Sequence, residues 1–473
     1  MIKQIYLIAL ILPSLLQPNS QLQATNIKMR SSNSGRREHR QVLNVKDFHA
    51  QGDGQTDDTA AFAAALRKLS DAGGTLIVPP GTYLVGDLSV ASGLILKGLQ
   101  ADYSAVLLKA PNAKTILNIS PPVGCNSALP LHDIALQYLT FRGRSVEDGF
   151  SEHIHNVNVA GVERLSFTRV RFEAFQGDGL YLGALAAGSS TPLHNSEINV
   201  SDSSFDGVNS QNRNGISVID CTHCVFEHND FSRVSRPDMP GAIDLEPNHQ
   251  EEVIQYISVK SNTIKDGRGA GVSVSVNLSR FLTEPSHISI EGNQIRNTTK
   301  GIVIYWKSIA LGSETATPQV LIRGNLIDNA EHAMIMDGTG AIAVIANDIV
   351  GSSQGLQLGT RFGISNVRFI NNTFRRVGTN SRHGITIAGP VTSLVFERNT
   401  FEDLGSRGQN SSAVYCIQGA VKDVTFTGNI FSSPKHQTIF AIATGDRAEI
   451  NLNVKRWKDN DLKDGIRPGL PVR

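Results

Sequence analysis

The segment Val259-Lys-Ser-Asn262-Thr-Ile264 places an asparagine in a β-rich stretch, and the same phrase returns along the chain. The other copies are Phe226-Glu-His-Asn229-Asp-Phe231, Ile290-Glu-Gly-Asn293-Gln-Ile295, Ile322-Arg-Gly-Asn325-Leu-Ile327, Ile345-Ala-Asn347-Asp-Ile349, Ile370-Asn-Asn372-Thr-Phe374, Phe396-Glu-Arg-Asn399-Thr-Phe401 and Phe426-Thr-Gly-Asn429-Ile-Phe431. Successive asparagines are 33, 31, 32, 22, 25, 27 and 30 residues apart. Such periods are typical of a solenoid or array in which loops of different length separate constant elements.

Apolar residues around these asparagines recur at every second position, which excludes helical repeats and predicts a coil of parallel strands. A propeller is the rival architecture, but its antiparallel blades need hairpin turns such as Asn-Gly, which are scarce here. We predict a structural role for the asparagines. Asparagine tolerates the left-handed conformation of a sharp bend, and its amide can bond to the amide of the next coil.

A second strand follows each asparagine, and these strands align. The aligned lines are Gly179-Leu-Tyr-Leu, Gly215-Ile-Ser-Val, Ala242-Ile-Asp-Leu, Gly271-Val-Ser-Val, Gly301-Ile-Val-Ile, Ala333-Met-Ile-Met, Gly355-Leu-Gln-Leu, Gly384-Ile-Thr-Ile, Ala413-Val-Tyr-Cys and Thr438-Ile-Phe-Ala. Their second and fourth positions are apolar and are expected to face the core. The third and fifth positions then face outward, where chemistry can take place.

The composition limits the class of protein. A chain of 473 residues with 43 glycines, 6% aromatic and 18% charged residues suggests one repetitive core rather than several domains. Four cysteines are too few for a disulfide scaffold of this length. With 44 basic and 43 acidic residues there is no basic excess to bind a polyphosphate, so we expect no nucleic-acid partner.

The N-terminus has the pattern of an export signal. Residues 1–24 contain an apolar run that is too short to cross a bilayer and end at the small residue Ala24, which predicts a cleaved signal peptide. A retained membrane anchor is the alternative. Residues 25–41 are polar and basic and are expected to form a flexible linker. The mature protein is thus expected to be secreted or periplasmic, with no membrane contact after cleavage.

The block from Val42 to Tyr83 carries a family resemblance. It contains Gly-Asp-Gly-Gln-Thr-Asp-Asp-Thr at 52–59, a run of helix formers, and Gly-Gly-Thr-Leu-Ile-Val-Pro-Pro-Gly-Thr at 73–82. Asp57, Asp58 and Thr59 suit a helix N-cap and its first-turn charge, with a metal-binding acidic pair as the alternative. The block resembles the opening of the pectate-lyase-like superfamily, which includes family-28 glycoside hydrolases, rhamnogalacturonases, alginate epimerases and phage tailspikes.

The resemblance implies an all-β fold: a single-stranded right-handed parallel β-helix with an N-terminal capping α-helix. We expect a cap at 42–83, the β-helix at 84–455 and a C-terminal tail at 456–473. The motifs that carry catalysis in the family-28 hydrolases, the alginate epimerases and the pectate lyases are absent. The fold therefore transfers to this chain, whereas the activity does not.

Asp244 and Glu246 form the candidate catalytic pair. They occupy the third and fifth positions of one line, so both leave the same outer face with backbones roughly 6.5–7 Å apart. This spacing resembles an inverting glycosidase, whose acid and base are about 6.5–9.5 Å apart. Repulsion between the carboxylates would raise one pKa and separate the acid from the base. The alternative is a pair of solvated surface acids.

Several nearby residues are candidate substrate ligands on the same face. They are Asp178, Arg213, Ser273, Tyr305, Lys307 and Asp337, with Ser275 beside them. Arg213 and Lys307 suit a substrate carboxylate, and Tyr305 with Trp306 suits stacking on a sugar ring. The insertions at 184–196, 233–240, 278–286 and 310–318 are expected to form groove walls.

Other candidates are weaker. Cys221-Thr-His-Cys224 resembles half of a zinc site without a second half, so core cysteines or an incidental disulfide are favoured. His332 and His383 precede their strands at equivalent positions, about 9.6 Å apart for two coils. A structural or merely exposed role is favoured over a second subsite.

The sequence thus predicts an exported glycoside hydrolase that cleaves a polysaccharide, expected to contain uronate, by acid–base chemistry without a cofactor. A lyase or C5-epimerase is the alternative on the same fold: Arg213, Lys307 or Tyr305 would then remove a proton and acids would hold calcium. A non-catalytic glycan-binding surface protein is the third possibility. The polysaccharide is the expected partner, and a monomer and a homotrimer both remain open.

Overall fold

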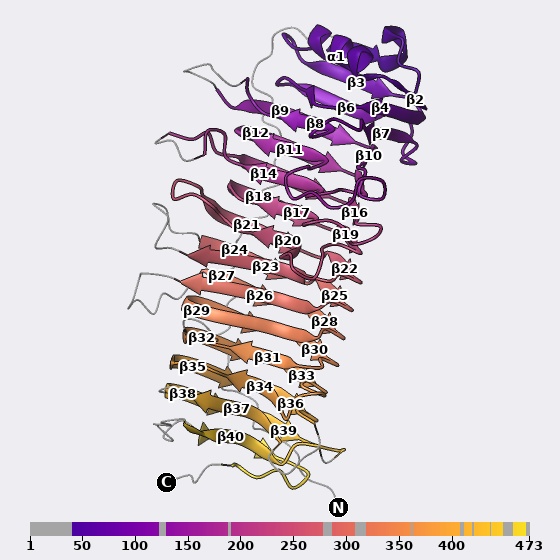
Figure 1. Ribbon diagram of the computed structural model, residues 1–473. Helices are drawn as coiled ribbons and strands as arrows, with labels where there is room; N and C mark the ends of the chain where they lie inside the picture. Colours follow the sequence, from indigo (N-terminus) through magenta and orange to yellow (C-terminus); the bar gives the residue numbers. More distant parts are fainter. Residues whose placement is uncertain are drawn as a thin grey trace, which may run out of the picture. The chain divides into compact units, whose positions relative to one another are not determined.

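The computed structural model describes residues 40–122, 129–187, 191–277, 286–307, 318–360, 363–406, 411–418, 421–435, 437–447 and 457–469. The expected signal peptide and nearly all of the linker lie outside these ranges. The described chain is a right-handed parallel β-helix with one α-helix at its N-terminal end, as predicted (Figure 1). No helix of the described residues is long and apolar enough to span a membrane.

Each complete coil contributes one short strand to a 15-stranded sheet and two strands to a 27-stranded sheet. The 15-stranded sheet comprises β2 (Asp53–Asp57), β4 (Gly81–Val85), β7 (Ala105–Lys109), β10 (Thr140–Arg142), β13 (Arg171–Glu173), β16 (Ser204–Asp206), β19 (Asp230–Ser232), β22 (Thr263–Lys265), β25 (Gln294–Arg296), β28 (Leu326–Asp328), β30 (Asp348–Val350), β33 (Thr373–Arg375), β36 (Thr400–Glu402), β39 (Ile430–Ser432) and β42 (Asp461–Leu462).

Two parallel series of strands make up the larger sheet, and they join in the long strand β29 (His332–Ile345). The first series contains β5 (Leu88–Ser89), β8 (Leu117–Ile119), β11 (Val157–Ala160), β14 (Leu180–Gly183), β17 (Ile216–Val218), β20 (Gly241–Leu245), β23 (Ala270–Asn277), β26 (Lys300–Lys307), β31 (Gly355–Leu358), β34 (His383–Ile387), β37 (Ser412–Gln418) and β40 (Phe440–Arg447). The second contains β1 (Val42–Asn44), β3 (Gly74–Val78), β6 (Leu94–Gly98), β9 (Leu131–Gln137), β12 (Val162–Thr168), β15 (Ser196–Ser201), β18 (Cys221–Glu227), β21 (Ile254–Lys260), β24 (Ser286–Glu291), β27 (Val320–Arg323), β32 (Ile364–Ile370), β35 (Val391–Glu397), β38 (Val421–Thr427) and β41 (Trp457–Lys458).

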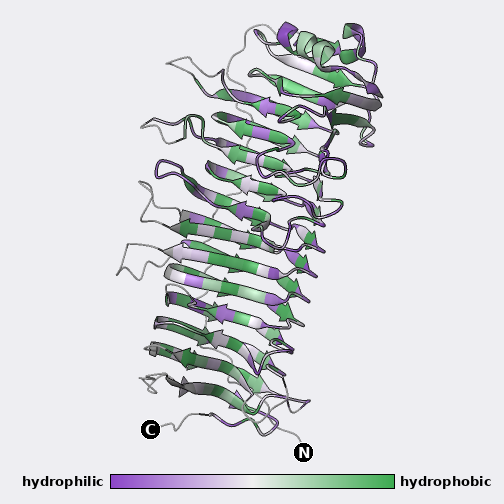
Figure 2. Cartoon of the chain, viewed as in Figure 1, coloured by the Kyte–Doolittle hydropathy of each residue, from purple (hydrophilic) through white to green (hydrophobic). Residues whose placement is uncertain are grey.

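The core lies inside the coil, where apolar side chains at alternate positions stack from one strand to the next. Phe205, for example, lies 4.5 Å from Phe172 and 4.7 Å from Phe231 between ring centres. Figure 2 shows the apolar colour concentrated on the strands. Nine of the ten aligned lines pair in the predicted register. The tenth is wrong by three residues, because Ala441 rather than Thr438 is level with Ala413.

The repeated asparagines form a hydrogen-bonded ladder, as predicted. The side-chain amide of Asn262 donates to Oδ1 of Asn293 over 3.0 Å, and it also donates to the backbone carbonyl of Phe226 over 2.9 Å. The backbone N–H of Asn262 donates to the same Oδ1. This pattern repeats from Asn229 to Asn429 and continues to Asn460.

One of the two reasons given for asparagine at these turns, its tolerance of the left-handed conformation, is wrong. The left-handed residue is the one that precedes the ladder asparagine: Ser261 before Asn262 and Arg398 before Asn399, with φ of 54° and 53°. The ladder asparagines themselves do not have a positive φ. Asparagine is therefore required for its amide, which satisfies buried backbone groups, and not for its backbone freedom.

The helix α1 (Thr59–Lys68) lies beside the 3-10 helix η1 (Val45–Phe48) at the N-terminal end of the coil (Figure 1). Phe62 and Leu66 of α1 are buried, so the helix covers the open apolar end. The N-cap residue is Asp58, which makes no side-chain capping bond, whereas Asp57 before it accepts a hydrogen bond from the backbone N–H of Thr59. Asp58 instead accepts from the backbone of Gln51 and Gly52, and thereby ties the preceding loop to the helix.

The segment expected to be a plain C-terminal tail carries two more strands. β41 pairs with β38 and β42 pairs with β39, and Asn460 between them extends the ladder. The β-helix thus continues past residue 455. It does so because the tail keeps the ladder asparagine and the apolar residues on either side of it.

Candidate functional site

One outward column of side chains crosses the first strand series and changes in chemistry from coil to coil. Its members, in register, are Asn118, Asn158, Tyr181, Ser217, Asp244, Ser273, Val303 and Ile335. The first six are polar or aromatic. The last two form a small apolar cluster with Ala270 and Tyr305. The polar part of this column, called the polar column below, holds the candidate site.

Asp244 and Glu246 converge on Arg213 from strand β20 and the residue that follows it. Oδ2 of Asp244 lies 3.9 Å and Oε2 of Glu246 lies 3.4 Å from Nη2 of Arg213. Both oxygens lie against the same nitrogen, and the charge of Glu246 raises the pKa of Asp244, so the two acids are close together. The spacing of their carboxyl groups, expected from the backbone to suit an inverting glycosidase, stays a prediction.

Burial separates the two acids. Asp244 is fully buried, whereas the side chain of Glu246 is 35% exposed. Burial raises the pKa of the Asp244 carboxyl well above its usual range, the charge of Glu246 raises it further, and Arg213 acts in the opposite direction. Oδ2 of Asp244 accepts a hydrogen bond from Asn214, while its Oδ1 accepts none within the part of the chain described. An oxygen that accepts no bond is the expected place for the proton.

Arg213 is enclosed by four acids. Besides Asp244 and Glu246, it lies 3.5 Å from Asp178 and 3.6 Å from Glu152. Its side chain is only 12% exposed. Burial opposes its charge, yet Asp178 and then the other three carboxylates raise the pKa of the guanidinium. Arg213 is thus the shared counter-ion of an acidic cluster, and its donors point at this protein's own carboxylates.

The turns before β14 and β17 hold Asp178 in place. Asp178 is buried, and its Oδ1 accepts a hydrogen bond from the backbone N–H of Asn214 over 3.0 Å. The imidazole of His155 accepts from the backbone N–H of Asp178, also over 3.0 Å. Asn214 in turn donates to Ser217 and accepts from the backbone of Gly241. Asp178 is therefore part of the support for Arg213 and is covered from solvent.

The remaining predicted ligands are only partly brought together. Ser273 is level with Asp244 on the next strand. Tyr305 and Asp337 lie on β26 and β29, further along the coil, and Asp337 is buried and accepts a hydrogen bond from Thr360. The side chain of Lys307 lies outside the described residues.

Trp306 is fully buried in the core, so it cannot stack on a sugar as we expected. Its position alternates with Tyr305 on β26, and the side chain therefore faces inward.

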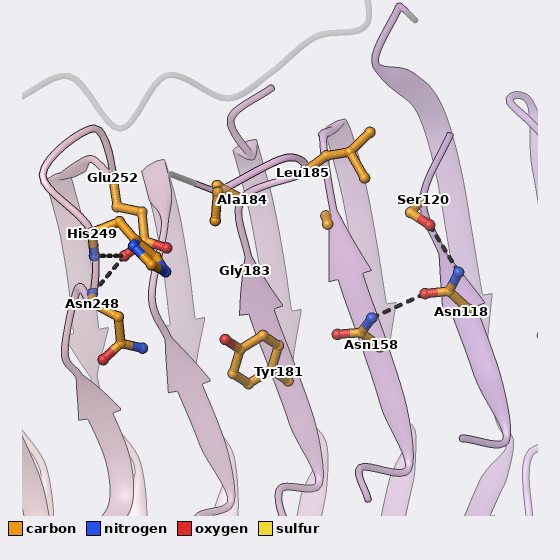
Figure 3. Close-up of a pocket in the computed structure, with 12 residues that line it drawn as sticks. Asn118, Ser120, Asn158, Tyr181, Gly183, Ala184, Leu185, Asn248, His249 and Glu252 are labelled. Carbon is orange, nitrogen blue, oxygen red and sulfur yellow. Dashed lines mark hydrogen bonds between the residues drawn. The ribbon is translucent and has the colours of Figure 1, made fainter. Parts of the chain in front are cut away.

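A pocket that the sequence did not predict lies on the same column. It has a volume of about 320 Å³ and is shown in Figure 3. Its floor contains Asn118, Asn158 and Tyr181, while the loops after β14 and β20 form its walls. The lining residues are Asn118, Ser120, Asn158, Ala160, Tyr181, Gly183, Ala184, Leu185, Ala187, Asn248, His249 and Glu252. Ala184, Leu185 and Ala187, at the start of the insertion at 184–196, thus contribute to a wall.

This pocket was missed for two reasons. The lines Leu117-Asn-Ile and Val157-Asn-Val lack the glycine that opens most later lines, so they were not aligned. Glu252 and His249 come from an irregular loop whose course has no periodic signal. A search for apolar–polar–apolar triplets upstream of Gly179 would have found the first two.

The weaker candidates have structural partners. Cys221 and Cys224 are joined by a disulfide within one strand, and Cys416 is free and buried. His383 contacts Ser412 over 2.8 Å and stacks on Tyr415, and burial lowers its pKa to about 4. These contacts agree with the structural role that was favoured for His383.

The calcium of the lyase alternative finds no prepared site in the described part of the chain. No group of three His, Cys, Asp or Glu side chains there is arranged to hold a metal ion. The carboxylates nearest the polar column direct their oxygens at Arg213, which is the wrong partner for a cation site.

Comparisons with known proteins agree with this architecture. Residues 42–303, more than half of the chain, match the family described as rhamnogalacturonase A/epimerase, pectate lyase-like. Residues 281–454 match the right-handed beta helix region.

Two curated relatives match only short segments. Alginate lyase 7 from Azotobacter vinelandii is 51% identical over 57 residues, which is 11% of this chain and 7% of the relative. An exopolygalacturonase from Arabidopsis thaliana is 50% identical over 47 residues, 10% of this chain and 11% of the relative. The chain therefore covers only a small part of either relative.

A solved structure extends the fold comparison to most of the chain. The surface protein and adhesin PfbA of Streptococcus pneumoniae has a TM-score of 0.55 and 15% identity, and the match covers 85% of this chain and 100% of that one. At this identity the likeness concerns the fold alone.

Proposed function

Since the chain belongs to the rhamnogalacturonase A/epimerase, pectate lyase-like family, we propose that it is a carbohydrate-active enzyme that hydrolyses a polysaccharide along the polar column. Asp244 and Glu246 are its acid and base. The observation that carries the proposal is the unequal pair: a fully buried carboxyl with a raised pKa next to a carboxyl that is 35% exposed. Two acids whose environments separate their protonation are the arrangement that acid–base catalysis requires.

Hydrolysis uses one proton held by this pair. One carboxyl gives its proton to the glycosidic oxygen as the bond to the anomeric carbon breaks. The other takes a proton from the water that attacks that carbon. The pair then holds one proton again, and the products are two sugar chains with a new reducing end. Arg213 keeps its positive charge in the free protein, where it lies beside the pair.

Asp244 reaches a substrate only if its cover moves. In the free protein Arg213 and Glu246 lie against it, and Glu246 is the member of the pair that meets solvent. We propose that a bound chain displaces Arg213 toward Glu152, its most exposed partner, whose side chain is 48% exposed. Glu246 then meets the substrate first.

Hydrolysis is favoured over the lyase and epimerase alternative because Arg213, the base that this alternative places beside the pair, and the neighbouring Tyr181 both hold their protons firmly. Proton removal next to a uronate carboxylate requires a neutral basic group, which a depressed pKa provides. Here the carboxylates raise the pKa of Arg213, and burial raises that of Tyr181 to about 12. Neither group suits the role.

We also propose that the enzyme acts outside the cytoplasm, because residues 1–24 have the pattern of a cleaved signal. The expected substrates are therefore polysaccharides that lie outside the cytoplasm.

Incubation of the purified protein with a panel of polysaccharides tests the proposal. We expect new reducing ends and no ultraviolet absorbance from unsaturated products. Asp244→Asn and Glu246→Gln should each lower turnover by about 100-fold or more, as loss of a general acid or base does. Ser365→Ala, on the second strand series, is the matched control and should keep wild-type turnover.

Three results would contradict the proposal. Unsaturated products would identify a lyase, and a changed uronate configuration without cleavage would identify an epimerase. Binding without any turnover, unaffected by both substitutions, would identify a glycan-binding protein.

A further inference from the structure

The pocket of about 320 Å³ is an extension of the candidate site, not a separate cavity. Tyr181 on its floor and Asp244 belong to one column, with Ser217 between them. Two strand spacings, about 9.6 Å in all, therefore separate their backbones. A chain that lies along the column at Asp244 and Glu246 passes over this pocket.

The floor of the pocket offers hydrogen-bonding groups that are not fully used. Asn158 donates to Asn118 over 3.0 Å, and Asn118 donates to Ser120 over 2.8 Å (Figure 3). Each amide has two donors and two acceptor positions, so both keep capacity for a ligand. Unlike the ladder, this chain of amides ends at the pocket surface, where a sugar hydroxyl can take the remaining bonds.

Tyr181 presents an oriented hydroxyl. Its ring stacks on His155 with 4.7 Å between ring centres, which fixes the side chain. Figure 3 shows the hydroxyl end of the ring directed toward the loop that carries Asn248 and His249. No hydrogen bond of this hydroxyl occurs within the described ranges of the chain. It is therefore available to a ligand, on a ring that binding does not need to order.

The wall opposite carries the acidic side chain of Glu252, whose pKa is raised by burial, while two backbone N–H groups act in the opposite direction. Glu252 is buried and accepts hydrogen bonds from the backbone N–H groups of Asn248 and His249, over 2.5 and 2.7 Å. These bonds lock the loop and direct the carboxyl at the pocket. The buried Asp220 lies on the same side, paired with His194.

The charges around the pocket disfavour an acidic sugar. No lysine or arginine lines it, and the undescribed segments nearest in sequence, 123–128 and 188–190, contain no basic residue. Arg213, the cation closest along the column, is occupied by four acids. A uronate carboxylate placed here would lie next to Glu252 with no lysine or arginine in the pocket lining to offset the repulsion between like charges.

We propose that this pocket binds a neutral, hydroxyl-bearing sugar unit of the substrate, so that the enzyme acts on a polysaccharide that is uncharged at this position. This proposal rests on the proposed function only in treating the bound sugar as part of a substrate. Binding in the pocket itself does not require catalysis. The uronate expected from the sequence depended on Arg213 and Lys307; Arg213 is held by four acids, and the side chain of Lys307 lies outside the described residues.

Calorimetric binding to short oligosaccharides tests the proposal directly. The probes are neutral gluco-, galacto-, manno- and xylo-oligosaccharides, and oligosaccharides of galacturonate, mannuronate and guluronate. We expect at least one neutral probe to bind and every uronate probe to bind more weakly. Tyr181→Phe keeps the ring and its stack on His155, and should lower the affinity for the neutral probe about fivefold to tenfold. Tyr256→Phe, an exposed tyrosine on β21, is the matched control.

A second variant tests the charge argument. Glu252→Gln keeps an acceptor for the two backbone N–H groups and removes the charge, so it should narrow the preference for neutral over uronate probes about fivefold or more. Thermal unfolding verifies that both variants fold.

The outcomes separate the two proposals. Uronate probes that bind more tightly than all neutral ones, or a Tyr181→Phe variant that matches Tyr256→Phe, would overturn the pocket assignment even if the enzyme hydrolyses a polymer. Tyrosine-dependent binding of a neutral probe without turnover would support the pocket and overturn the proposed hydrolysis.

Discussion

Two stacks of polar side chains cross the coils of this protein, and they use their hydrogen bonds in opposite ways. In the asparagine ladder, Asn262 repeats the contacts of Asn229 and Asn293, and its amide bonds to buried groups of the protein. In the polar column, the side chain changes from coil to coil: Asn158 has an amide, Tyr181 on the next strand has an aromatic ring, and Asp244 two strands further has a carboxyl group. Both stacks are built by the same pairing of parallel strands.

The difference shows how to tell structure from function in a solenoid. A repeated residue whose donors and acceptors are satisfied by neighbouring coils stabilises the fold. A residue that departs from its column, and keeps an unpaired atom such as Oδ1 of Asp244, is a candidate for chemistry. Substitutions in the two stacks should therefore have opposite effects on stability and activity.

Arg213→Met should have the largest effect on stability. It removes the shared partner of four acids and leaves the buried Asp178 without its arginine counter-charge. We expect a loss of about 3–5 kcal/mol in the free energy of unfolding, measured by urea denaturation at neutral pH. Arg233→Met is the control, because Arg233 is exposed and pairs with Asp206 alone, and it should cost less than about 1 kcal/mol. Equal losses would show that Arg213 is not the centre of the cluster.

Asn325→Ala, in the middle of the ladder, should rank second. It leaves the backbone N–H of Asn293, the carbonyl of Ile290 and Oδ1 of Asn347 with fewer partners. We expect a loss of about 2–3 kcal/mol by urea denaturation. The exposed Asn380 serves as the control, and Asn380→Ala should stay within about 0.5 kcal/mol of wild type. A small loss at Asn325 would place the stability of the turns elsewhere.

Asp244→Asn should act in the opposite direction on stability. The pKa of Asp244 is raised in the folded state above its ordinary value of 3.8. The folded protein therefore holds a proton that the unfolded chain releases, and wild-type stability is lost as the pH rises from about 4 through the folded pKa. Asparagine does not titrate.

The variant should thus gain about 1 kcal/mol over wild type at pH 8, and the gain should shrink toward pH 4. Urea denaturation over this pH range measures it, with Asp206→Asn, at a partly exposed site outside this cluster, as the control. A gain that is constant with pH would mean that Asp244 is not protonated in the folded state.

Asn460→Ala, at the end of the ladder, should have the smallest effect. Asn460 is half-buried, accepts from Asn429 and donates to the carbonyl of Phe426, but it has no following asparagine among the described residues. We expect a loss of about 1 kcal/mol, less than at Asn325. Thermal unfolding of both variants in parallel gives the comparison. Equal losses would indicate that the ladder acts as one unit rather than coil by coil.

The periodic parts of the molecule were predictable because each coil repeats the same local rule. The ladder, the inward positions and nine registers follow from the spacing of asparagines and apolar residues. The register predicted for the last line was wrong because Thr438-Ile439 has the same residue pattern three positions before the residues that pair. The left-handed conformation was predicted for the asparagine but occurs at the residue before it. The sequence alone does not show which of these two neighbouring residues has a positive φ.

The site was predictable only where it lies on a strand. Asp244 and Glu246 stand out as a charged pair on one line, and the structure brings Arg213 to them. That Arg213 is shared by four acids could not be foreseen, because Glu152 and Asp178 reach it from turns whose course depends on packing. The walls of the pocket come from loops, which have no periodicity to read.

The asparagine ladder does not fix the number of residues in each coil. Between Asn229 and Asn325 the successive ladder residues are 33, 31 and 32 apart, whereas between Asn325 and Asn399 they are 22, 25 and 27 apart. The hydrogen bonds are the same in both stretches, so they set where a coil turns and not how long it is. Evolution can therefore lengthen or shorten the loops that border the groove, and with them the choice of sugar, while the scaffold is inherited unaltered.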